Sequence, residues 1–156
     1  MLDIVKERIL KFCMKKIGIL TFHKSINYGS VLQAWALCEA LENYEIRFID
    51  YEPDIYKENY GMFAIKKGVK YNLNRLLNCI AIYQQIKKFS EFRNHFFKCT
   101  EQYDSKKIKI SYFNEFDAII TGSDQIWNVH AEDADDIFFL PFSIKGKKIA
   151  YACSVN

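Results

Sequence analysis

The sequence lacks the features that mark secreted, membrane-spanning and zinc-binding proteins. No uncharged apolar run approaches the roughly 18–20 residues of a membrane-spanning helix, and charged residues interrupt any signal-peptide core near the start. The five cysteines are odd in number and widely spaced, and no C-x-x-C pair occurs, which argues against a zinc site and a disulfide framework. We therefore expect a cytoplasmic protein without a transmembrane segment, a metal site or a cofactor.

Glycine, proline and arginine are also scarce. The 6 glycines and 2 prolines form no flexible linker, so the 156 residues predict one domain. Only four of the 22 basic residues are arginine, the side chain that best clamps carboxylates and phosphates. The net charge of +3 is too small to indicate nucleic-acid binding. The 50% of hydrophobic residues, by contrast, are enough for one packed core.

Strand-like and helix-like segments alternate along the chain. Short apolar runs typical of buried strands occupy 16–22, 45–51, 116–121 and 147–153, and apolar residues at helical spacing occupy 31–43 and 72–98. This order predicts an α/β fold of Rossmann-like type, in which helices cover a mostly parallel sheet. Residues 53–71 show no clear period and are predicted to form a long loop, while 137–140 form a short apolar patch.

The two ends of the chain suggest boundaries. Residues 1–13 form an extra segment ahead of Met14, which we expect to be the natural start of a domain over 14–156. No helix follows the last strand-like run, so we expect this domain to be truncated.

The loop after the first predicted strand carries a group of polar residues. In open α/β sheets, ligands bind at the carboxyl ends of the strands, where this loop lies. Its candidate substrate-binding residues are His23, Ser25, Asn27, Tyr28 and Gly29. The free N–H groups of the helix that follows favour an anion or a sugar hydroxyl. Alternatively, Ser25 and Asn27 cap the turn and Tyr28 packs.

A second polar loop follows the strand-like run 116–121. It contains Ser123, Asp124, Gln125, Trp127 and Asn128, a combination suited to a saccharide because carboxylates and amides bind hydroxyls and an aromatic face covers the ring. Asp124 is the candidate general base, and the other four are candidate substrate-binding residues. Alternatively, Asp124 caps a helix beginning near Gln125, and Trp127 anchors that helix in the core.

Three motifs in order resemble the polysaccharide pyruvyl transferase family. The first is I-G-I-L-T-F at 17–22, followed by N-Y-G-S-V-L-Q-A at 27–34. The second is D-A-I-I-T-G-S-D-Q-I-W-N at 117–128, and the third is K-I-A-Y-A-C-S at 148–154. The resemblance implies the N-terminal domain of a two-domain, GT-B-like transferase with a cleft between its halves.

The resemblance also implies a reaction. Family members transfer pyruvate from phosphoenolpyruvate, the donor substrate, to a saccharide as a ketal during cell-surface polysaccharide synthesis. The partners implied are a saccharide or lipid-linked glycan acceptor and either a C-terminal half or a second copy of the chain. None of the four arginines lies in these motifs, so we expect the phosphoenolpyruvate cradle on a missing C-terminal half.

Two other functions remain open from the sequence. The chain could be a non-catalytic remnant that binds a glycan or a partner protein. It could also be a flavodoxin-like nucleotide binder that uses the helix terminus at Gly29, although the glycines of a G-x-G-x-x-G loop are absent.

Overall fold

The computed structural model describes residues 14–53, 76–103, 108, 110–122, 124–130 and 134–154. The N-terminal segment 1–13, nearly all of the loop predicted over 53–71, and Ser123 lie outside these residues, so their predictions stay untested.

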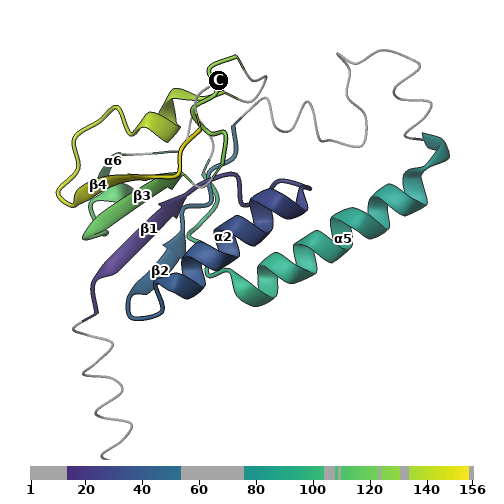
Figure 1. Ribbon diagram of the computed structural model, residues 1–156, viewed down its shortest axis with the longest axis horizontal. Helices are drawn as coiled ribbons and strands as arrows, with labels where there is room; N and C mark the ends of the chain where they lie inside the picture. Colours follow the sequence, from purple (N-terminus) through teal and green to yellow (C-terminus); the bar gives the residue numbers. More distant parts are fainter. Residues whose placement is uncertain are drawn as a thin grey trace, which may run out of the picture.

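A single parallel sheet forms the centre of the described structure (Figure 1). Its four strands are β1 (Lys16–Leu20), β2 (Glu45–Phe48), β3 (Ala118–Gly122) and β4 (Lys147–Tyr151), in the spatial order β2-β1-β3-β4. All three pairings are parallel, which confirms the predicted α/β, Rossmann-like class. The two-domain GT-B comparison stays a prediction.

Helices cover one face of this sheet. Helix α2 (Tyr28–Ala40) and the longer α5 (Cys79–Phe96) lie side by side there, and α5 extends well beyond α2 (Figure 1). Every second residue of a strand points to this face, and Ile17 and Ile19 of β1 pack there with both helices in one buried cluster. Within the helical pattern predicted over 72–98, the structure has α5, and residues 72–75 lie outside the described ones.

The opposite face of the sheet carries short elements. A single helical turn, α6 (Ile110–Phe113), and a 3-10 turn, η2 (Asp136–Phe139), pack there with Leu20 and Ile119 in a second buried cluster. The sequence pattern did not predict α6, because four residues are too few to show a helical period.

The chain reverses direction across the sheet between β1 and β3. From β1 it passes through α2 to β2 on one side, and it then returns past β1 to β3 on the other. The loops that leave the carboxyl ends of β1 and β3 therefore diverge, which creates the place where open α/β sheets bind ligands. Both polar loops singled out in the sequence leave the sheet at this place.

Strand β4 forms one edge of the sheet, and all five of its residues are exposed. Ile149 and Tyr151 are the large apolar side chains on it, 40% and 53% exposed.

Among the helices of the described ranges, none has the length and apolar character needed to cross a membrane.

Candidate functional site

The loop after β1 turns sharply before helix α2 begins. The N–H of His23 donates to the Thr21 carbonyl, and the N–H of Ser25 donates to the Phe22 carbonyl. Asn27 is the N-cap of α2, because its side-chain oxygen accepts the N–H of Gly29 at 2.8 Å. This contact agrees with the alternative in which Asn27 caps the turn. The Asn27 side-chain oxygen is therefore occupied by the cap, although the residue as a whole is exposed.

Tyr28 is both exposed and packed. Its ring lies against that of Phe89 of α5, tilted by 44° with centroids 4.8 Å apart, yet 69% of the residue is accessible. It borders an apolar groove of about 290 Å³ between α2 and α5, which Lys88 also lines. Gly29 is exposed beside it and Ser25 is half-buried, so the loop presents these three predicted residues along one short stretch of surface.

His23 lies inside the fold. It is 1% exposed and its ring packs against Phe48 and Phe97. Its Nδ1 lies 3.1 Å from the Thr21 carbonyl oxygen, and its Nε2 lies 3.5 Å from Oδ1 of Asp50. The ring is therefore not at the surface of the described structure, and the predicted binding role of His23 stays a prediction.

Lys24 is paired with two carboxylates that follow β2. Its Nζ lies 2.7 Å from Asp50 Oδ1 and 3.2 Å from Glu52 Oε2. Burial disfavours the charged form of Asp50, but contacts with His23 and Lys24 and their charges outweigh burial, so the pKa of the carboxyl lies below its usual value. The positive charge of Lys24, which is the cation of this motif loop, is therefore already neutralised.

Arg93 of α5 holds the same loop from a distant part of the sequence. Its guanidinium donates to the Lys24 carbonyl at 3.3 Å. The sequence pattern did not suggest this contact or the role of Glu52, because the residues are far apart in the chain and only the folded arrangement brings them together.

The loop after β3 begins at a glycine with a special conformation. Gly122 has a φ of +137°, which an L side chain rarely adopts. A Cβ on Gly122 would lie 1.9 Å from the Tyr151 carbonyl oxygen of β4. This close approach lets the β3 loop and the end of β4 run together, and the Ser154 N–H donates to the Asp124 carbonyl at 3.3 Å.

The polar side chains of this loop stand in turns. Residues 124–130 form turns and bends, and no helix begins at Gln125. Asp124 is half-buried and its Oδ1 accepts the N–H of Gln125 at 2.7 Å. Gln125 is exposed, and the half-buried Asn128 accepts the N–H of His130 at 3.1 Å. Asp124 and Gln125 therefore face the surface at the carboxyl end of β3.

One backbone carbonyl binds both the end of β3 and the loop that follows it. The Phe138 oxygen in η2 accepts the Thr121 hydroxyl at 2.7 Å and the Trp127 indole N–H at 3.1 Å. The buried Phe138 ring packs edge-on against Phe22 after β1 and Tyr51 after β2. The polar loops after β1 and after β3, here called the two motif loops, are thus joined through η2, which lies across the carboxyl ends of three strands.

Trp127 is anchored by η2 and stacked on it. Besides its hydrogen bond, its ring lies nearly parallel to that of Phe139, with centroids 5.5 Å apart and an angle of 13°. Trp127 also packs against the second buried cluster. The anchoring alternative therefore describes its contacts, and whether it also contacts a substrate stays a prediction. Phe139, 42% exposed, was missed because it lies 12 residues away, in a segment that showed only an apolar patch.

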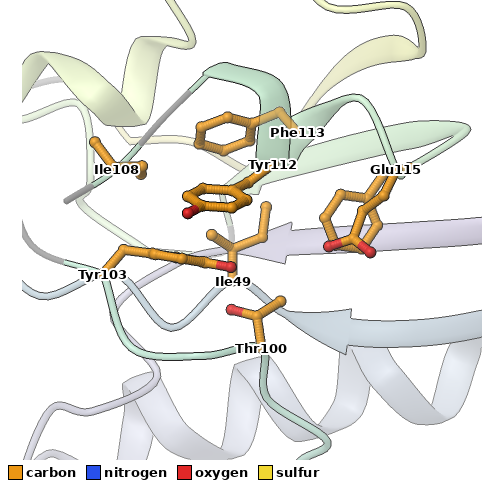
Figure 2. Close-up of a pocket in the computed structure, with 8 residues that line it drawn as sticks. Ile49, Thr100, Tyr103, Ile108, Tyr112, Phe113 and Glu115 are labelled. Atoms are coloured by element: carbon orange, nitrogen blue, oxygen red, sulfur yellow. The ribbon is translucent and has the colours of Figure 1, made fainter.

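A separate hollow near α6 is not part of this site. Figure 2 shows it among Ile49, Tyr103, Tyr112 and other residues near α6. The rings of Tyr103 and Tyr112 stack at 4.8 Å, and the hollow has no space for a water-sized molecule. Within the ranges that the structure describes, no three His, Cys, Asp or Glu side chains gather as metal ligands.

The comparisons with known proteins identify a family for this chain. The model of the polysaccharide pyruvyl transferase family matches residues 27–156, a range that contains the start of α2, the whole loop after β3, and β4. Searches among curated proteins and among solved structures found no match. Because the family match spans most of the chain, this protein belongs to the polysaccharide pyruvyl transferase family.

Proposed function

We propose that this chain supplies the saccharide-binding side of a pyruvyl transferase that forms a ketal on a glycan from phosphoenolpyruvate. The family membership supports a transferase with a saccharide acceptor. The observation that carries the proposal is the place of the two motif loops, which leave β1 and β3 where the chain reverses across the sheet.

The reaction needs an acid, a base and an anion cradle. Protonation of C3 of phosphoenolpyruvate makes C2 electrophilic, and one acceptor hydroxyl adds to C2 and loses its proton. The C2–O bond to phosphate then breaks, and the second hydroxyl adds to C2 and loses its proton to close the ketal. Of the two protons released, one balances the protonation of C3 and the other leaves on hydrogen phosphate. One pyruvate ketal and one phosphate leave for each donor consumed.

Asp124 is the group that we assign to proton removal from an acceptor hydroxyl. It is half-buried at the carboxyl end of β3, and the Gln125 N–H holds its Oδ1. Gln125 is exposed beside it and offers a second polar side chain to hydroxyls. At the start of α2, the exposed Asn27 offers its side-chain NH2 group, whereas its side-chain oxygen and the Gly29 N–H already bind each other.

We assign the anion cradle to groups outside these two loops. Lys24 is already paired with Asp50 and Glu52, so it has little charge left for a phosphate and a carboxylate. This pairing also favours a second function, in which the chain binds glycans without catalysing transfer.

Binding and turnover measurements on the 156-residue chain test the proposal. We expect methyl hexopyranosides to shift backbone NMR signals of the two motif loops, with phosphoenolpyruvate shifting them far less. Asp124→Asn should retain hexoside binding. In any preparation of the chain that releases phosphate, Asp124→Asn should lower the rate of release about 10²–10⁴-fold, the usual contribution of a general base.

Three results distinguish the alternatives. A chain that binds none of the hexosides contradicts the saccharide site. Phosphate release by the chain alone, abolished by Lys24→Met, contradicts the assignment of the cradle. Full phosphate release by Asp124→Asn contradicts its role as the base and favours glycan binding as the contribution of this loop.

A further inference from the structure

The stacked pair of Trp127 and Phe139 lies partly at the surface. The two rings are nearly parallel, and the inner ring is that of Trp127, which packs against the buried cluster. Phe139 is 42% exposed, whereas the residues on either side of it, Phe138 and Leu140, are 1% and 2% exposed. The outer ring is therefore turned outward between two buried neighbours.

The backbone that holds Phe139 in this position is tightly defined. The Asp135 side chain caps the turn by accepting the Ile137 N–H at 3.0 Å, and the Tyr51 hydroxyl donates to the same carboxylate at 2.6 Å. Leu140 closes the turn in the left-handed conformation, with φ of 50°, which is uncommon for a residue with a Cβ. Strained positions of this kind are frequent at binding sites.

We propose that Phe139 is the residue on which a pyranose ring of the acceptor stacks, with Trp127 as its rigid support. This inference rests on the proposed saccharide-binding function and extends it to a residue that none of the motifs contains. The apolar C–H face of a pyranose fits a flat aromatic surface, and its hydroxyls need polar partners at the rim.

The surroundings of the pair favour a saccharide over a purely apolar ligand. Trp127 lies on the same loop as the exposed Gln125 and the half-buried Asn128, so amide groups stand within two residues of the supporting ring. The pair also lies at the carboxyl end of β3, since Thr121 and Trp127 donate to the same η2 carbonyl. An aromatic ring and polar side chains at the carboxyl end of one strand offer the two kinds of contact that a sugar ring requires.

An NMR titration of the full chain tests the proposal. Trp35→Phe leaves Trp127 as the single indole of the chain, because the sequence has 2 tryptophans. The indole N–H signal of Trp127 is followed while methyl β-galactopyranoside, methyl β-glucopyranoside or methyl α-mannopyranoside is added. Sorbitol, which has hydroxyls but no ring, is the control ligand.

Substitutions of Phe139 distinguish the effect of its aromatic ring from the effect of its size. Phe139→Ala and Phe139→Leu should each weaken binding of the preferred glycoside roughly three- to tenfold, and Phe139→Tyr should leave it nearly unchanged. Tyr44→Ala is the matched control, because Tyr44 is 40% exposed but precedes β2, at the opposite edge of the sheet. Thermal unfolding of each variant shows whether the fold is retained.

The outcomes separate this inference from the proposed function. If the unsubstituted chain binds no glycoside, both fail. If it binds a glycoside and Phe139→Ala or Phe139→Leu binds it equally well, only the stacking role of Phe139 is overturned. The stacking role is also overturned if Tyr44→Ala weakens glycoside binding as much as Phe139→Ala does, or if sorbitol binds as tightly as the glycoside. Neither result could come from stacking of a sugar ring on Phe139.

Discussion

Replacement of Gly122 by alanine tests how the loop after β3 is held. Gly122 has a φ of +137°, and a Cβ at this position would lie 1.9 Å from the Tyr151 carbonyl oxygen and 2.8 Å from Cys153 Sγ. The Cys153 side chain can rotate away, but the carbonyl belongs to β4, which pairs with β3 over its whole length. The overlap can be relieved only if the two strands separate at this end.

The expected cost follows from these two effects. A residue with a Cβ held at an unfavourable φ costs about 1–3 kcal/mol. Overlap with a neighbour that cannot move adds a further cost of about 1–3 kcal/mol. Gly122→Ala should therefore lower the free energy of unfolding by about 3 kcal/mol or more, a large part of the roughly 5–15 kcal/mol of a typical domain.

Urea unfolding at neutral pH measures this cost against a second glycine variant. Gly29 lies in the first turn of α2 without a positive φ, and a Cβ there would meet only the Asn27 Oδ1 at 3.2 Å. Alanine is preferred over glycine in a helix by about 0.5–1 kcal/mol, so Gly29→Ala should stay within about 1 kcal/mol of the parent. Equal urea midpoints for Gly122→Ala and Gly29→Ala would refute the argument from close approach.

Two further predictions concern contacts at the carboxyl ends of the strands. The pKa of Asp50 lies below its usual value of about 3.9, so its carboxylate stabilises the fold above that pH and ceases to do so as the pH falls through the lower folded value. The difference between urea midpoints at pH 7 and pH 3 should thus be smaller for Asp50→Asn than for the parent, and equal differences would exclude this group as a source of acid sensitivity. Thr121→Val and Trp127→Phe should each cost about 1 kcal/mol, because each leaves the Phe138 carbonyl one donor. The double variant leaves it none and should cost about 1 kcal/mol more than the sum, so strict additivity in a double-mutant cycle would contradict a shared acceptor.

The strands and the α2 helix could be predicted because their signals are local. Buried parallel strands appear as short apolar runs, and each described strand falls within or beside a predicted one. The start of α2 was placed three residues too late, since the sequence shows several residues that can cap a helix and does not show which one adopts the extended conformation. In the structure Asn27 does, with a φ of −131°.

The candidate site was predicted in its loops and incompletely in its contacts. Polar loops after strands mark the carboxyl end of an α/β sheet, so the motif residues could be chosen from the sequence. The pairing of Lys24 with Asp50 and Glu52 could not be predicted from the sequence, because it joins loops that follow two different strands. Phe139 could not either, since its exposure depends on the turn at Leu140 and on the support of Trp127.

The sequence by itself determined the α/β class, the order of the strands along the chain and the family, because apolar periodicity and motif spacing are properties of neighbouring residues. Only the tertiary structure decided which groups remain available to a ligand. Lys24 is neutralised by carboxylates beyond β2, His23 is buried, and Phe139 is turned outward. Charge neutralisation and exposure depend on atoms brought together from distant parts of the chain, and no local pattern records those distances.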